Sequence, residues 1–143
     1  MLVLSWQVAV AALALAMALN DARQFKVPNA IPTGLAVLFL LAAISIFPFE
    51  RSLISAATGA AVITVGFGLF VADLLPGGDA KALAAAALIV APWDWVTVLI
   101  AFWLMTLFLG LILLFQGRGK KSRFPMGLPI GLTLAGYALS TPP

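Results

Sequence analysis

Long apolar stretches separated by short polar segments run along the whole sequence. A helix needs about 20 residues to cross roughly 30 Å of hydrocarbon, and backbone groups in lipid must be hydrogen-bonded within the chain. Four stretches reach or approach this length, a fifth is short, and a sixth is interrupted by glycine and proline. In chain order they are residues 2–19, 31–47, 53–72, 82–91 (the short one), 95–115 and 126–139 (the interrupted one). They predict an all-α membrane protein, a bundle of six transmembrane helices that forms one domain over residues 1–143.

The composition supports this interpretation and narrows the chemistry. Of the 143 residues, 64% are hydrophobic and 9% are charged, whereas a soluble domain is about 25% charged because polar groups must cover its core. The sequence has neither cysteine nor histidine. Thiol nucleophiles, Ser-His-Asp triads and histidine-ligated zinc are therefore excluded. Carboxylates, lysines, hydroxyls and the backbone remain, and we expect no metal and no cofactor.

The basic residues indicate how the chain is oriented. If six segments cross and the N-terminus is outside, three loops share the cytoplasmic face of the inner (plasma) membrane and hold seven of the eight basic residues. These seven are Arg23, Lys26, Lys81, Arg118, Lys120, Lys121 and Arg123, and only Arg51 falls elsewhere. The positive-inside rule then places both termini outside, provided that segment 82–91 crosses. No positive region precedes the first segment, so we expect a retained helix rather than a signal peptide.

Several other residues have ordinary interpretations. The basic cluster in the last cytoplasmic loop is expected to anchor the chain at the inner leaflet rather than bind nucleic acid. Trp6, Trp93 and Trp95 lie near predicted helix ends, where tryptophan commonly marks the membrane interface. Glu50 and Asp94 fall in outside turns, where we expect solvated charges.

The other three acids, Asp21, Asp73 and Asp79, lie at the cytoplasmic ends of the first, third and fourth segments. An acid at this depth is costly unless it is paired or faces a cavity, so each is a candidate for function. Asp21 opens the segment Asp-Ala-Arg-Gln-Phe-Lys-Val-Pro-Asn, which ends at Pro28 and Asn29 just before the second predicted helix.

Asp79 belongs to the segment Pro-Gly-Gly-Asp-Ala-Lys, residues 76–81. Gly77 and Gly78 would let the backbone turn sharply and approach a substrate strand closely, with Asp79 at the start of the fourth helix. The alternative is a plain turn followed by an aspartate that caps the helix.

The two motifs together resemble the type IV prepilin peptidases, membrane aspartyl proteases of the GxGD class. That family carries an aspartate followed seven and eight residues later by Pro-Asn, and further on a Gly-x-Gly-Asp-x-Lys. The matching residues are Asp21, Pro28 and Asn29 in the first motif and Gly78, Asp79 and Lys81 in the second, where Pro76 replaces the first glycine. Residues 125–131 are similar to the Pro-x-Gly stretch of the family's last helix, so the resemblance covers most of the chain.

The resemblance implies a catalytic pair, Asp21 and Asp79, facing one another across a cytoplasmic cleft. One ionised aspartate would take a proton from a shared water while the other, protonated, donates to the scissile carbonyl. The sequence does not say which is the base. The supporting motif residues would be Pro28, Asn29, Gly77, Gly78 and Lys81, with Lys81 either tuning Asp79 or anchoring the inner face. Asp73 matches neither motif and is expected to be dispensable.

The implied substrate is a prepilin, which has a short basic leader followed by an apolar helix and is cut after a glycine at their boundary. Longer family members have a cysteine-bearing cytoplasmic insertion that this chain lacks. The chain therefore resembles the short form that serves Flp or Tad-type pili, and the methyltransferase activity of the longer members is not expected.

Three alternatives stay open. A small polytopic transporter or channel would also place acids in helices, although no charge lies inside segments 53–72 and 95–115. A presenilin-like protease shares the glycine and aspartate signature, but its aspartates lie within spanning helices. The third alternative is a non-catalytic assembly subunit of a pilus or secretion system, because Pro76 interrupts the second motif. Gly127 and Gly131 form a small-xxx-small pair that we expect to join helices within the chain.

Overall fold

The computed structural model describes residues 1–116 and 124–141, and within them the chain is all-helical. Its elements are α1 (Leu2–Gln24), α2 (Ala30–Ser45), α3 (Phe49–Val71), α4 (Gly77–Ile89), the short 3₁₀ helix η1 (Pro92–Asp94), α5 (Trp95–Phe115) and α6 (Gly127–Ser140). All six predicted segments are confirmed as helices. The fourth begins earlier than its apolar run, because the helix already starts at the glycines of the second motif. The basic cluster Arg118, Lys120, Lys121 and Arg123 lies outside the described residues.

Long and short helices alternate along the chain. α1, α3 and α5 are each long and apolar enough to cross a membrane, whereas α2 and α6 are shorter apolar helices. α4 has 13 residues and is therefore only about 20 Å long. The three long apolar helices indicate a membrane protein.

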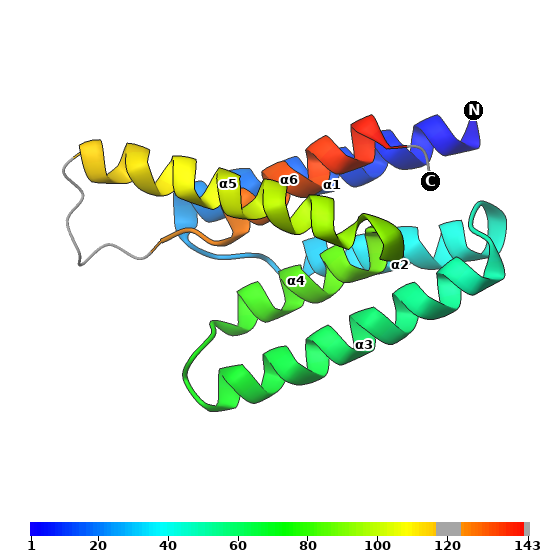
Figure 1. Cartoon of the computed structure of the whole chain (residues 1–143), viewed down its shortest axis with the longest axis horizontal. Helices are drawn as coiled ribbons and strands as arrows, with labels where there is room; N and C mark the ends of the chain where they lie inside the picture. The colour runs from blue at the N-terminus through cyan, green and yellow to red at the C-terminus, as the bar shows by residue number, and fades with distance from the viewer. Residues whose placement is uncertain (117–123, 142–143) are drawn as a thin grey trace.

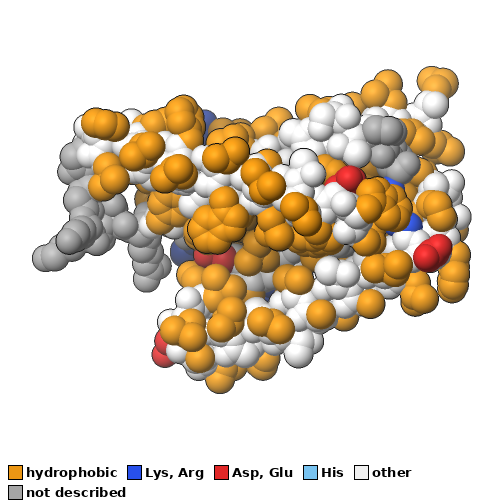
Figure 2. Space-filling model, viewed as in Figure 1, with side chains coloured by type: hydrophobic (Ala, Val, Ile, Leu, Met, Phe, Trp, Pro, Cys, Tyr) orange, Lys and Arg blue, Asp and Glu red, His pale blue; other side chains and the backbone are white. Residues whose placement is uncertain are grey.

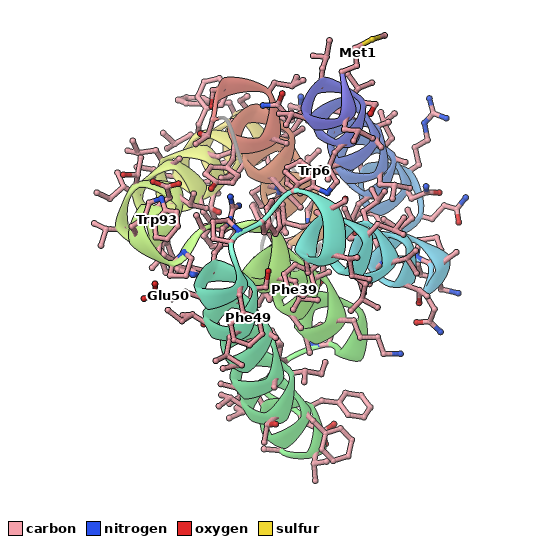
Figure 3. All side chains as sticks on the ribbon, turned by 90° about the vertical axis from the view of Figure 1, so that its right-hand side faces the viewer. Met1, Trp6, Phe39, Phe49, Glu50 and Trp93 are labelled. Carbon is pink, nitrogen blue, oxygen red and sulfur yellow. The ribbon has the colours of Figure 1, made fainter. Side chains whose placement is uncertain are left out.

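The short helix α4 lies inside the bundle. It packs against α2, α3 and α6, while α1 packs against α6 and α2, and α5 packs against α6. Figure 3 looks along the bundle and shows α2 and α3 on either side of α4. Most of the buried residues of α4 are alanines, and such small side chains let three neighbouring helices approach it closely. The neighbouring helices therefore cover most of this short helix.

Glycines set the closest contacts between helices. A Cβ atom on Gly131 would lie 2.9 Å from the Cβ of Ala18 and would also collide with the carbonyl oxygen of Ala14, so α6 lies directly against α1. The expectation that Gly127 and Gly131 join helices within the chain is confirmed. On the other side of the molecule, a Cβ on Gly66 would lie 2.9 Å from that of Ala80 in α4. The same small-residue packing therefore joins α3 to α4.

Apolar side chains cover the outside of the bundle. Figure 2 shows them along the face formed by α5 and α3, and none of the residues of α5 is buried within the chain. Such a surface is far too apolar for water. The pattern is the one expected where lipid, rather than a protein core, covers the helices.

Trp6 is a core residue and not an interfacial one, which corrects the sequence-based expectation. Its indole is only 6% exposed, its Nε1–H donates to the carbonyl of Leu38 at 3.1 Å, and its ring packs edge-on against Phe47 with centroids 5.1 Å apart. The side chain therefore joins α1 to α2. Glu50 is exposed, as expected for a solvated charge, and Trp93 is exposed as well; both are labelled in Figure 3. The interfacial positions of Trp93 and Trp95 stay predictions.

Asp94 is hydrogen-bonded, so the expectation of a simply solvated loop charge is wrong. Its Oδ2 accepts the hydroxyl proton of Tyr137 at 2.8 Å, and the Tyr137 oxygen in turn accepts the N–H of Ala91 at 3.0 Å. Arg51 is also buried, and its guanidinium donates to the carbonyl of Ile89 at 3.3 Å. These bonds tie the start of α3, the turn after α4 and the last part of α6 together at one end of the bundle.

Candidate functional site

Asp21 lies in the last turn of α1 and points at the beginning of α6. Its side chain is 4% exposed, and its Oδ2 accepts the backbone N–H of Gly127 at 2.7 Å. Phe25 ends α1 with a left-handed backbone, φ 52°, and its N–H donates to the carbonyl of Asp21. The first N–H groups of a helix lack partners within the helix. The carboxylate of Asp21 therefore serves as the partner of one of them, where the helix dipole also favours negative charge.

Gly127 is a residue of this site that the sequence did not identify as one. A Cβ there would lie 3.0 Å from both Cβ and Cγ of Asp21 and 2.9 Å from Cγ2 of Val27. No larger residue fits without moving the aspartate. The signal was present in the Pro-x-Gly stretch at the start of the last apolar segment, but nothing in the sequence shows that this glycine faces Asp21.

Asp79 lies in the first turn of α4, at the same end of the molecule. Pro76 is the N-cap residue, and its carbonyl accepts the N–H groups of Asp79 at 3.0 Å and Ala80 at 3.2 Å. The Asp79 side chain is 8% exposed and makes no capping hydrogen bond. It is therefore a buried acid and not a helix cap. Proline suits this position because it needs no N–H partner there.

Gly77 and Gly78 do not make the expected sharp turn. Both have helical backbone within α4, and the residue of this connection with a left-handed backbone is the exposed Asp73, φ 57°. A Cβ on Gly78 would lie 3.7 Å from that of Val27, an ordinary contact. Val27 thus touches both Gly78 and Gly127, so the connection after α1 packs against the starts of α4 and α6.

The two motif aspartates influence one another electrostatically. Burial, and to a lesser extent the negative charge of Asp21, raise the pKa of Asp79 to about 6. A carboxyl group with such a pKa is partly protonated near neutral pH. The ionised form of one acid therefore disfavours the ionisation of the other.

A side-chain hydrogen bond also joins the two motifs. Lys81 donates from Nζ to Oδ1 of Asn29 at 3.0 Å. Asn29 is the N-cap residue of α2, yet its side chain makes no capping bond to its own helix. The preceding Pro28 accepts the N–H of Ile31 at 3.1 Å and so helps to start α2. This bond holds the Pro-Asn pair against α4 at Lys81, which follows Asp79 by two residues.

The fold thus brings together most of the residues that the two motifs singled out, namely Asp21, Asn29, Gly78, Asp79 and Lys81. The other acids stand apart: Asp73 is exposed beyond α3, while Glu50 and Asp94 belong to the far end of the bundle. Figure 2 shows acidic side-chain atoms in the hollow between the left-hand ends of α5 and α3, the end at which Figure 1 shows α4 and α6 beginning.

This arrangement can carry general acid and base chemistry. One buried carboxyl with a raised pKa lies in the field of a second carboxyl that accepts a backbone N–H. Such a pair can take a proton from a water molecule and give one to a carbonyl oxygen. Within residues 1–116 and 124–141, no three acidic side chains gather in one place.

The comparisons with known proteins are of three kinds. The model of the type IV leader peptidase family matches residues 8–139 of the 143-residue chain. Searches of curated proteins and of solved structures find no match. The family match spans both aspartate motifs and the Pro-x-Gly stretch at the start of α6.

Proposed function

Since the chain belongs to the type IV leader peptidase family, we propose that it is an aspartic endopeptidase that removes the leader peptide from Flp or Tad-type prepilins. Asp21 and Asp79 form the catalytic pair, and cleavage occurs at the cytoplasmic face of the inner membrane. The observation that carries the proposal is the burial of both motif acids at one end of the bundle, where burial first and the charge of Asp21 second raise the pKa of Asp79. Buried acids cost stability, so a coupled pair is more readily explained by chemistry than by structure.

The geometry favours a division of roles between the two acids. Burial raises the pKa of Asp21, but the backbone N–H groups at the start of α6 offset part of this rise by stabilising its ionised form. No such bond opposes the rise at Asp79, whose pKa of about 6 favours its protonated form. In the proposed reaction, Asp21 takes a proton from water while the water oxygen attacks the scissile carbonyl carbon. Asp79 gives its proton to the carbonyl oxygen. When the C–N bond breaks, Asp21 returns its proton to the leaving amine and Asp79 regains one from the carbonyl-derived hydroxyl.

Single substitutions of the two aspartates test the pair. Asp21→Asn and Asp79→Asn each keep the side-chain shape and remove the ionisable group, so cleavage should fall by about 10³-fold or more. The double variant should be scarcely worse than either single one, because the two acids act as a unit. The measurement is the ratio of cut to uncut Flp-type prepilin, co-expressed with each variant and resolved by immunoblot.

Asp73→Asn is the matched control, since Asp73 is an exposed acid in the connection that leads to α4. It should keep most of the activity. Near-normal cleavage by Asp79→Asn would refute the aspartic mechanism. A wild-type protein that inserts but cuts no prepilin would instead favour a non-catalytic assembly subunit.

We also propose that the chain is one domain with six crossings and with both termini outside. Reporter fusions after Gln24 and Asp73 should then report the cytoplasm, and a fusion after Asp94 should report the exterior. The pair at Asp73 and Asp94 tests α4 directly, because α4 alone separates them. If both positions report the same side, α4 does not cross and the topology is wrong.

A further inference from the structure

A groove runs between α2 and α3 over the surface of α4. α2 and α3 both pack against α4, and the space between them has a volume of about 600 Å³. The wall contributed by α4 consists of Lys81, Ala84, Ala85 and Leu88. Residues three and four positions apart lie on the same face of a helix. One face of α4 therefore lines the groove along two turns.

The two other walls are equally one-sided and are made mostly of small residues. α2 contributes the face from Asn29 to Ala36, and α3 contributes Gly59, Ala60 and the larger Ile63. A Cβ on Gly59 would lie 2.9 Å from Cγ of Leu88, so α3 touches α4 at the groove floor. Small side chains on three helices leave room for another helix to approach closely.

The polarity of the groove changes along its length. Lys81 and Asn29, joined by their hydrogen bond, lie at one end, and the walls beyond are apolar apart from one threonine. From Lys81 to Leu88 the groove is about 10 Å long, and its volume then implies a section roughly 8 Å across. This approaches the diameter of a helix. The polar end lies at the first turns of α4, the end of the helix that also carries Asp79, although Asp79 itself does not line the groove.

We propose that this groove holds the apolar helix of the prepilin, with the segment just before that helix unwound across Lys81 and Asn29 toward Asp79. The inference rests on the proposed function and adds to it the surface that binds the substrate. An apolar helix matches the small apolar walls, and the free backbone carbonyls of an unwound segment match the amine of Lys81. Asp79 lies on a different face of α4 from Lys81, so the unwound segment reaches the catalytic pair by passing around the N-terminal end of α4, where Asp79 occupies the first turn.

Two neighbouring alanines on α3 give a matched test by obstruction. Ala60 lines this groove, whereas Ala61 lines a smaller apolar hollow on the other side of α4, and both are exposed. Ala60→Trp should lower the cleavage of full-length Flp-type prepilin about tenfold or more, because the indole fills the space of the substrate helix. Cleavage of a peptide that ends a few residues past the cut should be unchanged. Ala61→Trp should cut both substrates at the wild-type rate.

The closing experiment does not depend on catalysis. A photoreactive benzoylphenylalanine is placed at position 60 or at position 61 in the Asp79→Asn protein, together with epitope-tagged Flp-type prepilin. Irradiation should give a prepilin adduct from position 60 and none from position 61. Adducts from position 61 alone, equal adducts from both, or lipid adducts only would overturn the groove proposal. Cleavage by the Asp79→Asn protein would instead overturn the proposed mechanism, whatever the adducts show.

Discussion

Replacing Asp79 with asparagine should abolish catalysis and yet stabilise the protein above about pH 6. The pKa of this buried acid is raised from 3.8 to about 6, first by burial and then by the charge of Asp21. Between these two values the folded protein binds more protons than the unfolded chain. The free energy of unfolding therefore falls as pH rises from about 4 to about 6, and it stays lowered at higher pH.

The size of this effect follows from the shift. A rise from 3.8 to about 6 corresponds to about 3 kcal/mol at pH 7.5. Since Asp79 lies in the first turn of α4 near the bundle end, water screens part of its charge, and we expect on the order of 1–2 kcal/mol. Asparagine cannot ionise and avoids this cost. Most of the cost is absent at pH 4, so the gain from the substitution should largely vanish there.

The assay compares apparent melting temperatures by tryptophan fluorescence in one detergent at pH 4 and pH 7.5. The Asp79→Asn protein should gain on the order of 3 °C more over wild type at pH 7.5 than at pH 4. Any packing cost of the amide is the same at both values and cancels in the difference. Asp73→Asn, at an exposed position, should show no such difference. A gain that is equal at both pH values, or larger at pH 4, would refute the argument that Asp79 is a buried acid with a raised pKa.

Three further outcomes are expected. Gly127→Ala should lower prepilin cleavage about tenfold or more, because the new methyl group would lie 3.0 Å from the Asp21 side chain. In the same immunoblot, the control protein with Gly136→Ala should cleave normally, because a Cβ there would have no atom within 4 Å. Tyr137→Phe removes the hydroxyl that bonds both Asp94 and Ala91, so it should lower the unfolding free energy by about 1–3 kcal/mol while cleavage at permissive temperature persists. A larger loss of cleavage than of folded protein would contradict this. Cleavage by the wild type should fall above about pH 6, by roughly tenfold per pH unit, as Asp79 loses the proton that it donates. A flat profile from pH 6 to 8 would exclude Asp79 as the acid.

The sequence by itself determined the helices and the two acids. Apolar runs predict helices wherever lipid replaces water, because the backbone can satisfy its hydrogen bonds only internally. If every helix crosses the membrane, the first and the third both end on the cytoplasmic side. The Asp21 motif follows the first helix and the Asp79 motif follows the third, so both are expected on that side without knowledge of any packing. Their proximity stayed a prediction, since spacing along the chain says nothing about which helices touch.

The tertiary structure alone decided which residues surround those acids and which were misjudged. Gly127 faces Asp21 across 106 positions of sequence, and the bond from Lys81 to Asn29 spans 52. Trp6 resembled an interfacial residue from its place near a helix end, but contacts with Leu38 and Phe47 bury it. In lipid both the inside and the outside of a bundle are apolar, so hydropathy cannot distinguish a helix face that packs on protein from one that meets lipid. That distinction depends on the small residues at which helices come closest, and it appears only when the helices are placed together.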